Sequence, residues 1–441
     1  MPSSISRRKF LQTAAGISAA SIPAWAQDAG PQIILRPTQR PSHAPTLWLG
    51  AVTPTSAVVK TKLPPGTASR LLVLKAGAAP LSFKPQAVRD PQSNVTTFVL
   101  AGLEPASLYT LTLEVLGRPA SFPPGVLRTF PPANKPASFS FAFSSCARTG
   151  SQHRVFTTIV RKEPAFFLHL GDFHYVNISR NDPRLFRAAW DTVLSSSTQG
   201  ALYRTIPLDY VWDDHDFGPN NCDRRSPSRD AARAVYREYA PHYPLVSDGP
   251  IQHAFSIARA RFIITDLRSE RTPVGEKDGP NKSLMGSGQK EWFKRELLAA
   301  SRSHALVFWG SSVPWNGQSS SDAWANYQHE RREIANFIAR HRIRNLCILC
   351  GDAHMLAADD GTYSDFGDES ESLVRVLHGS ALDQAGSFKG GPYSHRSYLP
   401  RSEEGCFGWV NVEDDGTHVA VSFTGRNQKD EVKVSLAFTV A

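Results

Sequence analysis

The periodicity of hydrophobic and polar residues changes once along the chain. From Thr46 to about Phe130, apolar and polar positions alternate, as in TLWLGAVTPTSAVVKTKL. Alternation with a period of two predicts strands that bury one face. The pattern therefore predicts an all-β domain over residues 45–131.

Tyr109 indicates the architecture of this domain. It opens an alternating stretch directly after a Leu-x-Pro turn, in LAGLEPASLYTLTLEV. This arrangement resembles the tyrosine corner of immunoglobulin-like sandwiches. We therefore expect a small immunoglobulin- or fibronectin-III-like sandwich. The Pro-rich stretch PPANKPA at residues 131–137 predicts the linker that follows it.

Beyond the linker, short apolar runs alternate with longer amphipathic stretches. SFSFAFSSCA, AFFLHLGD and NLCILCGDAH are typical of strands, whereas SRDAARAVYREYA, GQKEWFKRELLAASRS and HERREIANFIARHRI are typical of helices. Strands that alternate with helices predict an α/β layered domain, here over residues 137–441. Polar residues follow the predicted strands, at the edge where functional residues gather in such folds.

The first residues predict an export signal that is not part of the fold. Arg7-Arg8 stands in SRRKFL, a modestly apolar stretch follows, and AWA gives a small-x-small cleavage pattern. These features are typical of a twin-arginine signal over residues 1–26, followed by an extended leader over residues 27–44. The apolar stretch is too short and too polar for a stable membrane anchor. We expect the twin-arginine export machinery as a partner and a periplasmic or secreted location.

The composition is compatible with an anionic ligand but does not identify one. The net charge of +9 suits a phosphate substrate, and simple solubility explains it equally well. No run of Lys and Arg marks a nucleic-acid-binding motif. The five cysteines are an odd count, so at least one thiol is left unpaired. Cys347 and Cys350 lie on an apolar run typical of a buried strand, which favours packing over a redox or zinc role.

Four clusters of polar residues follow predicted strands. They are SSCART with Cys146, HLGDFHY with Asp172 and Tyr175, VWDDHDFGPNN at residues 211–221, and LCGDAH with Asp352 and His354. Burying unpaired like charges costs roughly several kcal/mol each, and a bound cation reverses their repulsion. If residues 211–221 stood alone, an acidic surface loop would explain them. Four clusters at the same edge of the predicted sheet instead indicate a polynuclear metal site.

The mixture of donor atoms predicts the kind of metal. Phenolate, thiolate and carboxylate together suit a trivalent cation such as Fe³⁺. Extra carboxylates and amide oxygens suit Ca²⁺ or another divalent neighbour. A closed structural zinc site would instead want four sulfur or nitrogen ligands.

The ordered motifs resemble those of one family. Ser-Cys-Ala, Gly-Asp-x-x-Tyr, Trp-Asp-Asp-His-Asp-x-Gly-Pro-Asn-Asn and Gly-Asp-x-His follow one another, accompanied by SSVPW at 311–315 and GGPYSH at 390–395. This set is similar to that of the PhoD-like alkaline phosphatase/phosphodiesterase family of metallophosphoesterases. The resemblance implies a four-layer αββα core, secretion and a metal-dependent phosphoesterase activity. It also implies Fe³⁺ with Ca²⁺ as cofactors, with Zn²⁺ or other divalent metals as the alternative.

The resemblance further implies roles for single residues. Asp172 would bridge two cations, and His215 would donate a proton or contact the phosphate. The implied metal ligands are Cys146, Asp172, Tyr175, Asp213, Asp214, Asn220, Asp352 and His354.

A few neighbouring residues keep more than one interpretation. Many members of the family have Glu where this chain has Asp216, and the Gly-Pro spacing here leaves the choice between Asn220 and Asn221 open. His174 resembles half of a metal pair, but Tyr175 fits the family position better. Arg148 is a candidate phosphate clamp, because a guanidinium contacts oxyanions through two donors at once.

The sequence supports a principal function and two alternatives. The first is a phosphoesterase that hydrolyses phosphate monoesters, diesters or both by metal-activated water. A phospholipase D-like or polymer phosphodiesterase is the alternative among enzymes. A cell-wall- or carbohydrate-binding protein with an inactive catalytic domain is the alternative of another class, and the intact acidic clusters argue against it.

Overall fold

The structure is a computed structural model that describes residues 46–440, apart from residue 65 and residues 87–90, 318–321 and 369–371. All of the described residues lie in the unit Leu35–Ala441. The predicted signal and leader, residues 1–26 and 27–44, lie outside the described residues.

A nine-stranded sheet is the largest in the structure, with the strand order β20-β19-β18-β9-β10-β11-β1-β2-β5. Its strands are β1 (Leu47–Gly50), β2 (Ser56–Lys62), β5 (Val95–Ala101), β9 (Phe139–Ser144), β10 (Phe167–Leu170), β11 (Leu208–Val211), β18 (Cys406–Asp414), β19 (Val419–Asn427) and β20 (Val432–Val440). Strands β9, β10 and β11 run parallel, so their carboxyl ends meet at one edge of the sheet.

A six-stranded sheet with the order β12-β13-β14-β15-β17-β16 stacks on the first. Its strands are β12 (His253–Ile257), β13 (Ala260–Ile264), β14 (Leu306–Ser311), β15 (Leu346–Cys350), β16 (Leu356–Asp359) and β17 (Arg375–Gly379). The ring of Phe141 in β9 lies 5.3 Å from that of Phe262 in β13 and 5.2 Å from that of Phe308 in β14. Buried aromatic rings therefore fill the space between the two sheets.

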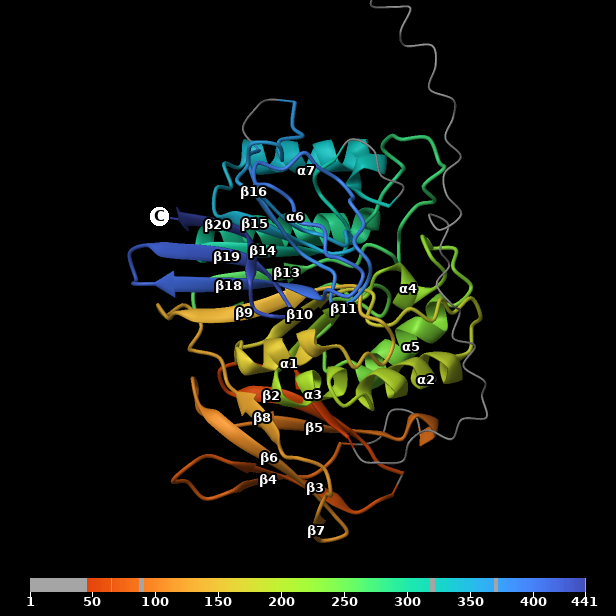
Figure 1. Ribbon diagram of the computed structural model, residues 1–441, viewed down its shortest axis with the longest axis vertical. Coiled ribbons are helices and arrows are strands. Elements are labelled where there is room, and N and C mark those ends of the chain that lie inside the picture. The colour runs from red at the N-terminus through yellow and green to blue at the C-terminus, as the bar shows by residue number, and fades with distance from the viewer. Residues whose placement is uncertain (1–45, 65, 87–90, 318–321, 369–371, 441) are drawn as a thin grey trace, which may run out of the picture. The chain divides into compact units, whose positions relative to one another are not determined.

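Helices cover the outer faces of both sheets (Figure 1). The helices on the side of the nine-stranded sheet are α1 (Arg154–Arg161), α2 (Pro183–Leu194), α3 (Gln199–Thr205) and α5 (Arg229–Tyr239). The helices on the side of the six-stranded sheet are α6 (Gly286–Ser303) and α7 (Gln328–Arg340). A single turn, α4 (Asp214–Phe217), follows β11, and short 3-10 turns lie at Pro91–Ser93 and Trp324–Asn326. The predicted αββα layering is confirmed.

The N-terminal strands form the expected all-β region. A third sheet contains β3 (Ser69–Leu74), β4 (Leu81–Phe83), β6 (Leu108–Val115), β7 (Arg118–Pro119) and β8 (Gly125–Arg128). The backbone N–H of Glu104 donates to the hydroxyl of Tyr109 at 2.8 Å, which is the contact a tyrosine corner makes.

The β region also shares a sheet with the α/β region. Strand β1 pairs in parallel with β11, with Gly50 opposite Leu208, so β1, β2 and β5 extend the nine-stranded sheet. Periodicity in a sequence indicates where strands lie but not which strands pair, so this connection was not foreseen. The domain boundary at residues 131–137 stays a prediction.

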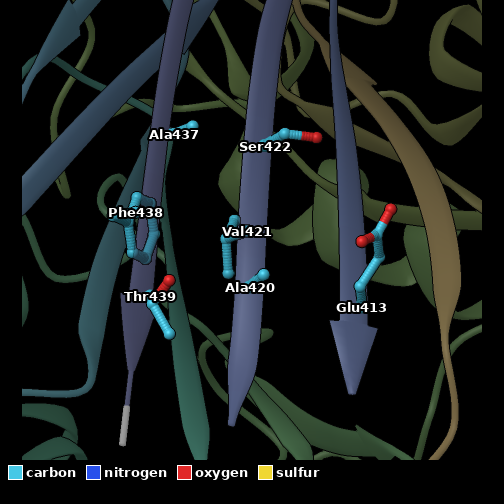
Figure 2. Close-up of a pocket in the computed structure, with 7 residues that line it drawn as sticks. All are labelled: Glu413, Ala420, Val421, Ser422, Ala437, Phe438 and Thr439. Atoms are coloured by element: carbon cyan, nitrogen blue, oxygen red, sulfur yellow. The ribbon is translucent and has the colours of Figure 1, made fainter. Parts of the chain in front are cut away.

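A shallow hollow of about 300 Å³ lies over β18, β19 and β20 (Figure 2). Its lining residues are Glu413, Ala420, Val421, Ser422, Ala437, Phe438 and Thr439. Glu413 is the one titratable side chain among them, so the hollow brings no set of reactive groups together.

Candidate metal centre

The candidate centre lies where several strands of the two stacked sheets end. Cys146 follows β9, Asp172 follows β10, Asp213 follows β11 and Asp352 follows β15. The backbone φ angles of Cys146, Asp172 and Asp352 are 63°, 56° and 60°. A left-handed conformation in a residue other than glycine costs about 1–3 kcal/mol and is concentrated at functional sites. Three strand ends therefore adopt the same unfavourable bend to present their side chains.

Gly171 allows two of these strand ends to meet. Its φ is 95°, and a Cβ atom at this position would lie 2.4 Å from the Cβ of Asp213. The small residue in the Gly-Asp motif therefore permits close contact between the end of β10 and the end of β11.

The first half of the centre contains Cys146, Asp172, Tyr175 and His354. Oδ2 of Asp172 lies 3.3 Å from Sγ of Cys146 and 2.8 Å from the Tyr175 hydroxyl. The Tyr175 hydroxyl lies 3.2 Å from Nε2 of His354. Ligand atoms of Cys146, Asp172 and His354 all lie within 4.8 Å of one another, which is close enough to hold one ion.

His354 is oriented by its other ring nitrogen. Nδ1 lies 2.8 Å from the carbonyl oxygen of Ala385, so Nδ1–H donates there and the lone pair of Nε2 faces Tyr175. Burial lowers the pKa of His354 to about 3. The imidazole is therefore neutral at ordinary pH, which is the form that binds metals.

The second half of the centre is acidic and shares Asp172 with the first. Ligand atoms of Asp172, Asp214 and His215 lie within 4.8 Å of one another, and so do those of Asp172, Asp213 and Asp352. A third such group contains Asp213, Asp214 and Asp322. Asp172 is thus the side chain placed to bridge two ions.

Unsatisfied carboxylate oxygens show that these residues fit cations. Oδ1 of Asp172, Oδ1 of Asp214 and Oδ2 of Asp352 are buried and have no hydrogen-bond partner among the described residues. Burial, followed by repulsion from neighbouring carboxylates, raises the pKa of Asp172 well above its usual value. Burial also raises the pKa of Asp352 to about 6. A bound cation would pair with these oxygens and remove the repulsion.

The stretch DDHD of residues 213–216 forms a compact turn in which Asp216 has a structural role. Oδ1 of Asp216 accepts the N–H of Asp213 at 2.7 Å. Oδ2 accepts the hydroxyl of Tyr210 at 2.7 Å and the N–H of Phe173 at 2.8 Å. Asp216 therefore holds the turn and the neighbouring Gly-Asp motif in place, which leaves Asp214 and His215 directed at the centre.

Arg268 was missed by sequence reasoning, and it lies beneath the acidic half. Its guanidinium makes two 2.8 Å bonds to Asp213, and it contacts Asp322 at 3.1 and 2.6 Å. Arg271 forms a further ion pair with Asp322. The signal was the sequence TDLRSER after β13, which places two arginines directly after a strand. Both carboxylate oxygens of Asp213 therefore accept hydrogen bonds from Arg268. The role of Asp213 as a metal ligand stays a prediction.

His215, the predicted proton donor or phosphate contact, lies at the edge of the centre. Its Nδ1 lies 2.6 Å from Oδ1 of Asn177, and its ring stacks on that of Tyr175 with centroids 4.0 Å apart. Because the Asn177 oxygen can only accept, Nδ1 carries the proton and Nε2 is left for exchange with a ligand. Burial lowers the pKa of His215.

The remaining predicted residues lie further out. The Arg148 side chain is exposed, while its backbone N–H donates to Oδ1 of Asp383 at 2.7 Å. The Asn220 and Asn221 side chains are exposed, and the Asn221 N–H donates to Oδ2 of Asp214 at 2.6 Å. His174 is buried, and neither of its ring nitrogens has a hydrogen-bond partner within the described part of the chain. The candidate ion-binding groups do not include it.

Lys389 is a second basic residue of the centre that the sequence did not indicate. Its Nζ lies 2.5 Å from Oδ1 of Asp352.

The five cysteines form no disulfide: all of them are free. Cys347 and Cys350 lie in the buried strand β15, as their pattern predicted.

Comparison with known proteins places this geometry in a family. The sequence model of the family described as "PhoD-like phosphatase" matches residues 141–429. Alkaline phosphatase D of Bacillus subtilis (strain 168) is 26% identical over 308 aligned residues, and the match covers 57% of this chain and 52% of that protein. The chain thus matches about half the length of this relative.

Solved structures show the same fold. A structure of PhoD aligns over 90% of this chain and 90% of its own, with a TM-score of 0.69 and 19% identity. A purple acid phosphatase from yellow lupin (Lupinus luteus) seeds covers 90% of this chain and 74% of its own, with a TM-score of 0.61 and 11% identity. Among the described residues, no helix is both long and apolar enough to cross a bilayer. Because its family model spans all four strand-end clusters, the chain belongs to the PhoD-like phosphatase family.

Proposed function

We propose that this protein is an exported, metal-dependent phosphoesterase that hydrolyses phosphate monoesters, diesters or both. The observation that carries the proposal is the position of Asp172. It is shared between a thiol–phenol–imidazole group and an acidic group, and one of its buried oxygens lacks a partner among the described residues. Two cations that share one carboxylate are a common arrangement for phosphoryl transfer.

The donor atoms suggest a different cation for each half. Cys146 and Tyr175 offer a thiolate and a phenolate, which suit Fe³⁺. The carboxylates of Asp214 and Asp352 suit Ca²⁺ or another divalent ion. Zn²⁺ or other divalent metals in both halves are the alternative.

Residues of the chain supply the remaining chemistry. Bound cations would neutralise phosphoryl oxygens and lower the pKa of a water molecule. His215 is held by Asn177 at Nδ1, so Nε2 is the atom that would first take up the proton of the attacking water and then give it to the departing oxygen. Arg148 is exposed beside Cys146 and can contact phosphate from the solvent side.

Hydrolysis of two model esters tests the function. The wild-type protein, purified after export, should hydrolyse p-nitrophenyl phosphate or bis(p-nitrophenyl) phosphate and lose activity with a chelator. Asp172→Asn should lose metal and reduce the rate by about a thousandfold or more, because it removes a charge from both halves. The exposed Asp230→Asn is the matched control and should change neither. A metal-loaded wild-type protein that hydrolyses neither ester would instead favour the binding-protein alternative.

Export is tested separately. The twin-arginine signal at residues 1–26 supports a periplasmic or secreted location, reached through the twin-arginine machinery. Replacing Arg7 and Arg8 together by Lys should leave the precursor inside the cell. Normal export of that variant would contradict this part of the proposal.

A further inference from the structure

Lys389 is a basic side chain of the candidate centre that solvent can reach. Its side chain is 28% exposed, whereas those of Arg268 and Arg271 are 0% and 1% exposed. The two arginines are therefore enclosed with Asp213 and Asp322 and cannot meet a substrate that enters from solvent. Lys389 lies at the boundary between the buried carboxylates and the solvent.

The backbone around Lys389 is anchored on both sides. Before it, the N–H of Ser387 donates to the carbonyl of His354 at 3.1 Å. After it, the hydroxyl of Tyr393 lies 3.3 Å from the carbonyl oxygen of Lys389. Gly390 has a φ of 80°, and a Cβ there would lie 2.5 Å from the carbonyl oxygen of Asn316. The segment is thus packed against the loops of the centre, and this packing fixes the backbone from which the Lys389 side chain reaches Asp352.

The ammonium group has donors to spare. It carries three N–H donors, and within the described part of the chain its one carboxylate partner is Oδ1 of Asp352, at 2.5 Å. The other oxygen of Asp352, Oδ2, is buried without a partner among the described residues and is the one available to a cation. Lys389 can therefore keep its contact with Asp352 while a second N–H donates to an oxygen of a neighbouring anion.

We propose that Lys389 binds a non-bridging oxygen of the substrate phosphoryl group and makes the site prefer phosphate monoesters over diesters. The inference rests on the proposed phosphoesterase function and adds a substrate class to it. A phosphate monoester carries a charge of about −1.5 to −2 at pH 7, whereas a diester carries a single negative charge. The ammonium group at this boundary therefore attracts the monoester more strongly.

Substitution of Lys389 by Gln tests this assignment. For Lys389→Gln, kcat/KM for p-nitrophenyl phosphate should fall by about ten- to a hundredfold, the size expected for loss of a hydrogen bond to a charged group. For bis(p-nitrophenyl) phosphate it should fall by less than about threefold. The inhibition constant of inorganic phosphate should rise, the metal content should not change, and Lys389→Arg should restore part of the monoesterase activity. Lys135→Gln removes the same charge at an exposed position of the Pro-rich stretch 131–137 and should leave all of these values unchanged.

The outcomes separate this inference from the proposed function. Equal losses on both esters, or a loss of metal, would show that Lys389 acts through the metal centre and would overturn the specificity role. If the wild type is active and Lys389→Gln hydrolyses both esters at the wild-type rates, the proposed phosphate contact of Lys389 fails and the proposed function stands. If the wild type hydrolyses neither ester, the proposed function fails, and calorimetric binding of inorganic phosphate to the wild type and to Lys389→Gln still decides whether Lys389 holds phosphate.

Discussion

Sγ of Cys146 and Oδ2 of Asp172, which follow adjacent parallel strands, lie 3.3 Å apart at the candidate metal centre. Burial, followed by the charges of Asp172 and Asp352, raises the pKa of the thiol well above its usual range. A thiol in such surroundings has no reason to ionise by itself, but a bound cation deprotonates it and uses it as a ligand. The close contact of the pair supports the proposal that both residues are ligands of one ion.

Cys146→Ala should lower the metal content of the purified protein. Removing a direct ligand should reduce the affinity of the first half by more than the roughly 10- to 100-fold seen for outer partners of metal ligands. Elemental analysis after dialysis measures this. Cys347→Ala deletes another buried thiol, in β15, and should cost about 1 kcal/mol of stability without loss of metal. Full metal content in Cys146→Ala would exclude the thiol as a ligand.

Tyr175→Phe tests the identity of the metal. The substitution removes the hydroxyl that lies 2.8 Å from Asp172 and keeps the ring that stacks on His215. If Fe³⁺ occupies the first half, the wild-type protein should absorb visible light through its bound phenolate, and the variant should lose that band. Absorption spectra before and after the substitution measure the change. Tyr363→Phe, at an exposed tyrosine, should keep the band, and a colourless wild type would remove the iron assignment.

Much of the fold was predictable because local patterns report local structure. The alternating strands of the β region, the α/β alternation after residue 137 and the tyrosine corner at Tyr109 all appear where the sequence indicated. The pairing of β1 with β11 was not predictable, because strand pairing depends on packing between distant segments. The same reason applies to the two stacked sheets, in which parallel and antiparallel pairs are mixed: their strand order depends on contacts between distant segments and not on any single segment.

The candidate site was predictable only in part. Cys146, Asp172 and His354 stand in short motifs directly after strands, and the structure brings their ligand atoms together. Arg268 and Lys389 were not predicted, because motifs of metal ligands indicate acidic, thiol and imidazole side chains, whereas these two basic residues pair with the predicted ligands. Lys389 lies in a segment without helix or strand, 37 positions after Asp352, so no periodicity could place it beside that carboxylate.

Arg268→Met should destabilise the protein strongly. Arg268 is fully buried between Asp213 and Asp322, and its removal leaves an uncompensated buried charge. We expect a loss of about 3–5 kcal/mol in the free energy of unfolding, measured with denaturant. Arg184→Met breaks an ion pair to Asp182 in which the arginine is 74% exposed, and it should have little effect. Similar losses in both variants would contradict a buried ionic network beneath the centre.

The free energy of unfolding of the metal-free protein should fall as the pH rises between about 4 and 6. Burial raises the pKa of Asp352 to about 6, above the value of 3.8 for an unperturbed Asp. Once a chelator has removed the metal, the native state therefore holds a proton between these two pH values that the unfolded chain has already lost. The free energy of unfolding then falls as the pH rises through this window, because the native state binds more protons there. The raised pKa of Asp172 acts in the same direction.

Bound metal should reverse this fall in stability with rising pH. Metal binds the ionised carboxylates, so the affinity of the protein for metal falls when they are protonated. The melting temperature of metal-loaded protein should thus exceed that of chelator-treated protein by a wider margin at pH 8 than at pH 5. Comparing the two forms at each pH cancels the contribution of the other carboxylates in the chain. Asp352→Asn lacks the titrating group, so its margin should change less between the two pH values. A margin independent of pH in the wild type would mean that the buried carboxylates are not where the metal binds.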